Sequence, residues 1–260
     1  RDQVVSGINT MAFLQSLCEG HFLQMQNLLR EQPTHQANAN IVKSTVELFI
    51  FICADSTSVQ RLSSLEADLV EAIMLFLIEV MQGPCPENQL FITKSEAIVA
   101  IKYILPNSVS AEGSEEENVA KTLQLHATAV LLLKTCLEGR KDRECHEIIA
   151  TRIEVILLQE HQLLHEEQAH DLRVKRFLSD EEADILDKAL DSVVNVTTIK
   201  DELDKMPEYH LQIEAHKNDN EEIDQETAHY ISTIEIWWRG QIERVSFPLP
   251  RASPYLSEDA

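Results

Sequence analysis

The sequence has few basic residues and little glycine. Its 260 residues include 22 lysines and arginines against 44 aspartates and glutamates, which gives a net charge of −22. A chain this acidic repels nucleic-acid phosphates and anionic lipid headgroups, so we exclude both as direct partners. It can attract cations. Glycine occurs six times, and no glycine-rich phosphate-binding loop is present.

Signatures of membrane proteins and of enzymes are also missing. The longest apolar run is far too short to cross a bilayer, and no charged-plus-apolar signal opens the chain. Neither GxSxG nor GxGxxG occurs. We therefore expect no direct membrane span in this chain and no enzymatic activity. The chain begins with Arg1, and a helical pattern is already under way at Val4, so we expect it to be part of a longer protein.

The cysteines are odd in number and widely spaced. They are Cys18, Cys53, Cys85, Cys136 and Cys145. No pair has CxxC spacing, and four of the five lie in or beside apolar helical segments. This pattern predicts buried, reduced thiols in a cytosolic protein.

Helical periodicity dominates the chain and predicts a mainly α fold. We expect an armadillo-like helical stack with a small C-terminal β-hairpin. The expected helices are 3–18, 22–31, 39–54, 63–82, 87–105, 116–138, 143–171 and 179–206. The expected organisation is a helical regulatory body over 1–206, an acidic linker and short helix over 207–231, a coupling hairpin over 232–250 and a tail over 251–260.

The C-terminal segment "IEIWWRGQIERVSFPLP" changes from a helical to an alternating pattern. It predicts two strands joined at Arg239-Gly240. An isolated hairpin is marginal in water, so it should pack on the helical body or on a neighbouring subunit. Trp237 and Trp238 are adjacent and must point to opposite faces. We therefore expect these tryptophans, with Phe247, to leave apolar surface exposed for coupling to a partner.

Two patterns resemble metal sites without completing one. His165 and His170 are five residues apart, which leaves the two imidazoles about 140° apart around a helix and unable to share an ion. His161 and His165 have the correct i, i+4 spacing, but no third ligand is evident. An acidic, solvated helix face is the favoured interpretation there. The segment 218–226, "NDNEEIDQE", lacks the glycine of an EF-hand loop.

Two carboxylates lie near predicted helix ends. Glu79 is expected in the last turn of a helix, where the partial negative charge of the helix end disfavours it. Gln82 follows three residues later and should share its face. Glu19 precedes a break at Gly20, with His21 just beyond. Two carboxylates, an amide oxygen and an imidazole suit a calcium ion, but solvated carboxylates remain the alternative.

Three segments resemble, in the same order, a region of the inositol trisphosphate and ryanodine receptors. They are "FLQSLCEGHFLQMQNLLR", "QGPCPENQ" and the hairpin. "QGPCPENQ" and "FPLP" are closer to inositol trisphosphate receptors, whereas "CEGH" and "IERV" are closer to ryanodine receptors. No EF-hand pair precedes the hairpin, so the inositol trisphosphate receptor type is favoured.

The resemblance implies a cytosolic calcium-sensing region of a tetrameric, intracellular ligand-gated calcium-release channel. It places the chain on the cytosolic face of the endoplasmic reticulum or a related store, in contact with other domains and subunits. It implies Glu19 and Glu79 as calcium ligands, His21 and Gln82 as their supports, and a further ligand from beyond the pore. The alternative is a free-standing armadillo-like scaffold for protein partners.

Overall fold

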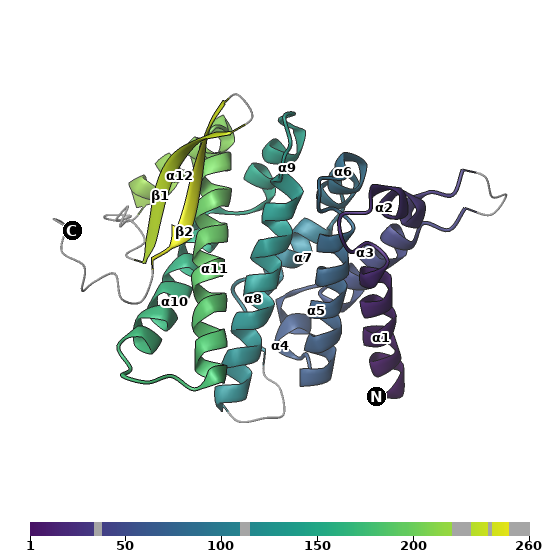
Figure 1. Ribbon diagram of the computed structural model, residues 1–260, viewed down its shortest axis with the longest axis horizontal. Coiled ribbons are helices and arrows are strands. Elements are labelled where there is room, and N and C mark those ends of the chain that lie inside the picture. The colour runs from purple at the N-terminus through teal and green to yellow at the C-terminus, as the bar shows by residue number, and fades with distance from the viewer. Residues whose placement is uncertain (34–37, 110–114, 220–229, 239–240, 250–260) are drawn as a thin grey trace.

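The computed structural model describes residues 1–33, 38–109, 115–219, 230–238 and 241–249 (Figure 1). Within these residues the chain forms twelve helices and one antiparallel pair of strands. The predicted mainly α fold with a C-terminal hairpin is confirmed, although the periodicity predicted fewer helices. The helices are α1 (Asp2–Ser16), α2 (Leu23–Arg30), α3 (Ile41–Ile52), α4 (Ser56–Gln60), α5 (Ser64–Glu79), α6 (Pro86–Lys94), α7 (Ala97–Ile104), α8 (Glu115–Leu137), α9 (Glu144–Arg152), α10 (Val155–Arg173), α11 (Asp180–Leu203) and α12 (Pro207–Asp219). The strands are β1 (Ile231–Trp238) and β2 (Gln241–Pro248).

The long helices stand side by side in the order α1, α5, α8, α11 and α10, so the last two are exchanged relative to their order along the chain (Figure 1). Helix α5 packs on α1, α8 packs on α5, and α11 packs on α8. Helix α10 then lies against α11, while the shorter helices α3, α7 and α9 pack on the long ones. Because each element contacts chiefly its neighbours in this row, the arrangement is that of a helical repeat protein.

Side-chain caps account for where several helices begin. Ser63 and Glu66 form a reciprocal capping box at the start of α5, and Ser179 and Glu182 form another at the start of α11. Each box satisfies backbone N–H groups that have no partner inside the helix. These two helices therefore have starting points that are encoded locally.

Helix α5 is the centre of the main core. Eight of its sixteen residues are buried, including Ile73, Met74, Phe76 and Leu77, all with no exposed surface. A helix that is apolar around most of its circumference must be covered on several sides. Neighbours α1, α3 and α8 provide this cover.

Two predicted helices are each divided in the structure. The predicted helix 87–105 breaks at Ser95, whose hydroxyl donates to the carbonyl of Ile92 at 2.6 Å and accepts from the N–H of Ala97 at 3.2 Å. These bonds replace the helical ones, so the chain turns between α6 and α7. The predicted helix 143–171 breaks at Ile153, which is extended and buried.

The second break depends on a residue far along the chain. Gln212 of α12 accepts from the N–H of Val155 at 2.9 Å and donates to the carbonyl of Ala150 at 2.7 Å. The first part of the predicted acidic linker is thus a thirteen-residue helix, α12, that supports the junction of α9 and α10. The chain from 220 to 229 lies outside the described residues, and with it most of the EF-hand-like segment 218–226.

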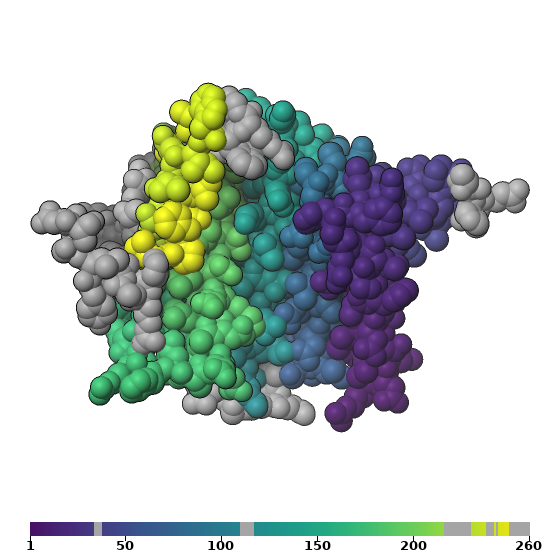
Figure 2. Space-filling view, viewed as in Figure 1, coloured from purple at the N-terminus to yellow at the C-terminus, as the bar shows by residue number. Residues whose placement is uncertain are grey.

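The hairpin forms as predicted and lies on α11 (Figure 2). Arg244 of β2 forms an ion pair with Asp201 of α11 at 3.7 Å, and Arg173 donates to the carbonyl of Leu249 at 3.0 Å. The turn at Arg239-Gly240 and the tail over 251–260 lie outside the described residues.

The predicted burial of the cysteine thiols is confirmed. All five cysteines are free and buried. Within the described part of the chain, no helix combines the length and apolarity needed to cross a bilayer.

Candidate metal-binding site at two helix ends

Two turns that are far apart in the sequence meet in the structure. The first joins α1 to α2 and contains Glu19 and His21; the second follows α5 and leads into α6. Gln26 of α2 is 1% exposed, and its amide nitrogen donates to the backbone carbonyls of Glu79 and Gln82, both at 2.8 Å. The last carbonyls of a helix have no partner within that helix. This amide satisfies the carbonyl of Glu79, the last residue of α5, and the carbonyl of Gln82 in the turn that follows.

A second buried amide strengthens the same junction. The side-chain nitrogen of Asn88 donates to the carbonyl of Gln26 at 3.1 Å and to that of Val80 at 2.9 Å. Asn88 has no exposed surface. Together the two amides hold the end of α5 against α2. The sequence pattern did not identify Gln26 or Asn88 as part of the site, because the contacts that join α2 to the end of α5 and to Asn88 link residues more than fifty positions apart.

Left-handed backbone conformations shape both turns. Gly20 and His21 have φ values of 73° and 58°, and Gly83 has a φ of 93°. A Cβ atom at Gly83 would lie 2.3 Å from the Cβ of His21. The two turns are therefore in such close contact that only glycine fits at position 83.

The charges of Glu19, His21 and Glu79 act on one another. Burial raises the pKa of the half-buried Glu79 carboxyl, the neighbouring His21 lowers it, and Glu19 raises it further. Burial, helped by Glu79 and then Cys85, raises the pKa of the Cys18 thiol to about 11. The structure thus brings the two predicted carboxylates and the predicted histidine to one junction.

Gln82 occupies a different position from the one predicted. Helix α5 ends at Glu79, so Gln82 lies in the following turn rather than in the last turn of the helix. Its N–H donates to the carbonyl of Ile78 at 3.0 Å, and its own carbonyl accepts from Gln26. The residue helps to build the junction through its backbone.

The hairpin exposes apolar side chains, as predicted. Trp237 is 72% exposed, its cross-strand partner Ile242 is 64% exposed, and Phe247 is 37% exposed. The side chain of Trp238 lies outside the described part of the chain. An exposed Trp–Ile pair on a two-stranded hairpin is a surface suited to a further protein contact.

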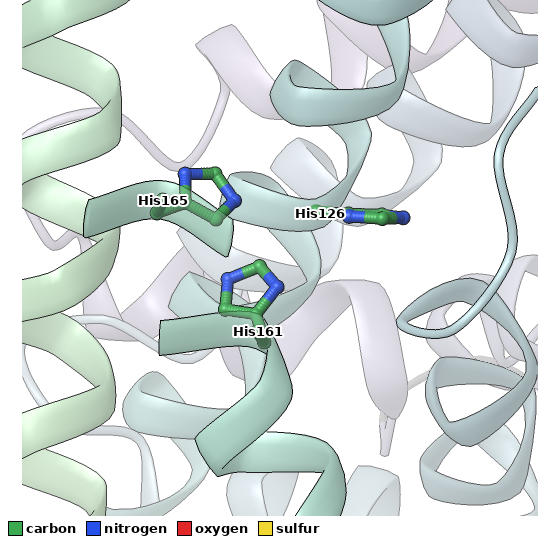
Figure 3. A group of neighbouring side chains, drawn as sticks. All are labelled: His126, His161 and His165. Carbon is green, nitrogen blue, oxygen red and sulfur yellow. The ribbon is translucent and has the colours of Figure 1, made fainter. Parts of the chain in front are cut away.

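A second group of metal-ligand types lies away from this junction and corrects the sequence analysis. His161 and His165 do not face solvent: they are 2% and 1% exposed, and His126 of α8 joins them (Figure 3). Among the described residues this trio brings one possible ligand atom from each ring within 4.8 Å of the others. The third ligand was missed because it lies 35 residues earlier, on another helix.

Fold and site together define a helical-repeat domain with an acidic pair at a junction of helix ends. Residues 2–105, which contain both of these turns, match the family described as "RyR and IP3R Homology associated". The chain is also 28% identical over 136 residues to the "Inositol 1,4,5-trisphosphate receptor itr-1" of Caenorhabditis elegans. That match covers 50% of this chain and 5% of the relative.

Over residues 2–105 the chain is therefore similar to the inositol trisphosphate receptor and ryanodine receptor superfamily, and the curated relative that it resembles is an inositol trisphosphate receptor. The chain spans a small fraction of the length of the curated relative that it matches.

Proposed function

We propose that this chain is a cytosolic regulatory, calcium-sensing module of an intracellular ligand-gated calcium-release channel. The chain would lie on the cytosolic face of the endoplasmic reticulum or a related calcium store, as part of a tetrameric channel. The observation that carries the proposal is the meeting of Glu19 and His21 with Glu79 at the end of α5. The family match over residues 2–105 supports the channel assignment.

Calcium binding at this junction follows from its charges. Burial, Glu19 and the helix end disfavour the ionised form of Glu79, and His21 opposes them in part, so the pKa of Glu79 is raised. A divalent cation between the two carboxylates would remove this repulsion. Calcium requires 6–8 oxygen ligands, more than two carboxylates provide. Other parts of the channel would supply the remainder, so the chain alone should bind weakly.

The fold offers a direct route for relaying this binding. Glu79 ends α5, which packs on α8, which packs on α11, and α11 carries the hairpin. A cation that favours one position of the α1–α2 turn relative to α5 would bias one arrangement of this row of helices. The hairpin would transmit the change to the pore through its exposed apolar side chains.

The calcium proposal is tested by binding to the 260-residue chain. Glu79→Gln and Glu19→Gln each remove one negative charge. Each should raise the Kd for calcium about tenfold, which corresponds to a loss of about 1.4 kcal/mol of binding free energy. Glu138→Gln is the matched control, because Glu138 is an exposed carboxylate just after the end of α8. It should leave the Kd unchanged. Lanthanide luminescence, with calcium as competitor, measures all four proteins.

Equal affinity in the wild type and both site variants would refute the calcium site. A loss of affinity in Glu138→Gln as large as in Glu79→Gln would show diffuse attraction to an acidic surface instead. If the longer protein lacked a pore-forming membrane region, the chain would be a free-standing scaffold and the channel proposal would fail.

The hairpin's role is tested separately in the full-length protein. Trp237→Ser should change the free energy of unfolding by less than about 0.5 kcal/mol, because the side chain is largely exposed. It should nevertheless reduce calcium-activated opening. Phe51→Ser on α3 is the control, since Phe51 is 80% exposed and lies away from the hairpin. Normal opening in Trp237→Ser would remove the coupling role.

A further inference from the structure

Three histidines form a buried cluster between α8 and α10 (Figure 3). His161 and His165 lie one turn apart on α10, with ring centroids 4.2 Å apart, and His126 of α8 lies 5.6 Å from the ring of His161. None is more than 3% exposed. One ring nitrogen from each lies within 4.8 Å of the others. Most buried polar side-chain atoms have a hydrogen-bond partner, so three buried imidazoles that lack some of theirs require an explanation.

The nitrogens that are left unpaired belong to all three rings. His126 Nδ1, His161 Nδ1 and both nitrogens of His165 are buried, and they have no hydrogen-bond partner among the residues that the structure describes. Each unpaired buried polar atom costs about 1–3 kcal/mol. A ligand that accepts nitrogen lone pairs would offset this cost at every ring.

The other two nitrogens have hydrogen-bond partners, and the partner of His126 leaves its inner nitrogen free to bind a metal. His126 Nε2 lies 3.0 Å from the carbonyl oxygen of Asn107. A carbonyl only accepts, so Nε2 carries the hydrogen and Nδ1 of the neutral ring carries the lone pair. His161 Nε2 lies 2.8 Å from the hydroxyl of Ser192 on α11. Hydrogen bonds to the outer nitrogen orient ligand imidazoles at metal centres.

The protonation state also suits a metal. Burial lowers the pKa of His126 and lowers that of His161 well below its usual value, with help from the two neighbouring rings. Burial and His126 lower the pKa of His165 to about 3. The three rings are neutral at pH 7, and a neutral imidazole binds a metal without first releasing a proton.

We propose that His126, His161 and His165 bind one transition-metal dication of the Zn²⁺ type through three imidazole nitrogens. A tetrahedral centre with Zn–N bonds of 2.0–2.1 Å needs ligand nitrogens about 3.4 Å apart. The three nitrogens lie within 4.8 Å of one another, so binding would require them to move closer together. Three nitrogen ligands leave a fourth position for water, and imidazole-only sites favour zinc, copper, nickel or cobalt over calcium.

A pocket connects the cluster to the surface. It has a volume of about 210 Å³ and is lined by His165 together with Glu181, Asp184 and Lys188 of α11. Glu181 and Asp184 are exposed carboxylates, and Asp184 pairs with Lys188 at 2.7 Å. Glu181 is therefore the carboxylate of this set that would attract a cation to the opening. Bound metal would join α8 to α10, and through Ser192 to α11, at the part of the fold that carries the hairpin.

The test titrates the chelator-treated 260-residue chain with Co²⁺ and then displaces it with Zn²⁺. Wild-type protein should bind one equivalent with the visible d–d absorption of a nitrogen-rich tetrahedral site. His165→Leu and His126→Gln should weaken binding about 100-fold or more. His146→Gln is the matched control, because His146 is equally buried but lies on α9 beside Glu202. It should bind like the wild type.

Several results would overturn the site. The wild-type protein would fail to bind one equivalent of metal, or His165→Leu would still bind it. Thiolate-to-cobalt charge-transfer bands would also overturn the site, because they would assign the metal to the cysteines. His165→Leu removes two unpaired nitrogens, so its metal-free form should unfold at or above the wild-type temperature, and its loss of binding cannot be ascribed to misfolding. Glu79→Gln should bind Zn²⁺ normally, which separates this site from the calcium proposal.

Discussion

Mild acid should destabilise this chain strongly, because three histidines that stay neutral while buried take up protons when the chain unfolds. Unfolded histidine has a pKa of about 6.5. In the folded chain the pKa of His165 is about 3, and those of His161 and His126 are also lowered. As the pH falls below 6.5 the unfolded chain binds protons that the folded chain does not. The free energy of unfolding therefore falls, by up to about 1.4 kcal/mol per pH unit for each such histidine.

The measurement is urea unfolding of the chelator-treated chain between pH 7 and pH 5. This window avoids the Glu202 carboxyl, whose pKa the hydrogen bond from His146 and the neighbouring Lys205 lower to about 2. That carboxylate contributes stability that is lost only below the ordinary glutamate range. His165→Leu should make the free energy of unfolding depend less steeply on pH, by the equivalent of about one proton taken up on unfolding. His210→Gln, at an exposed position on α12, should leave this pH dependence unaltered. An equal slope in His165→Leu would contradict this prediction.

Replacing Gly83 with alanine should separate the two turns of the candidate calcium site. The new Cβ would lie 2.3 Å from the His21 Cβ, on a backbone with a φ of 93°. Neither atom is the free end of a flexible side chain, so the backbone must move. We expect the free energy of unfolding to fall by about 2–4 kcal/mol, from strain together with lost contact. Calcium affinity should fall with it, because Glu19 and Glu79 would no longer be held together.

Gly20→Ala is the control for strain alone. Gly20 has a φ of 73°, but a Cβ there would meet no atom within 4 Å. It should cost about 1 kcal/mol and leave calcium binding nearly intact. Chemical denaturation and lanthanide binding of the two variants distinguish the effects. If both alanines lowered stability equally, the contact between His21 and Gly83 would have no energetic importance.

Local patterns in the sequence determined the class of the fold and its main elements. The apolar spacing of α5, the capping boxes at Ser63 and Ser179, and the alternation in the hairpin are all interactions between near neighbours. Such interactions depend only on the local sequence and not on the rest of the fold, so the mainly α fold and the hairpin could be predicted. The motifs around Glu19 and Glu79 identified the first site through a resemblance, since nothing in their spacing shows that the two turns meet.

The tertiary structure alone decided which distant groups meet. Gln26 and Asn88 bind the carbonyls at the end of α5, and Gln212 supports the break at Ile153, where periodicity predicted one continuous helix. His161 and His165 resembled a solvated face because the helix is acidic, yet α10 turns them inward towards His126. Such pairings depend on packing between helices, and a sequence pattern records spacing along one helix but not which helix lies opposite.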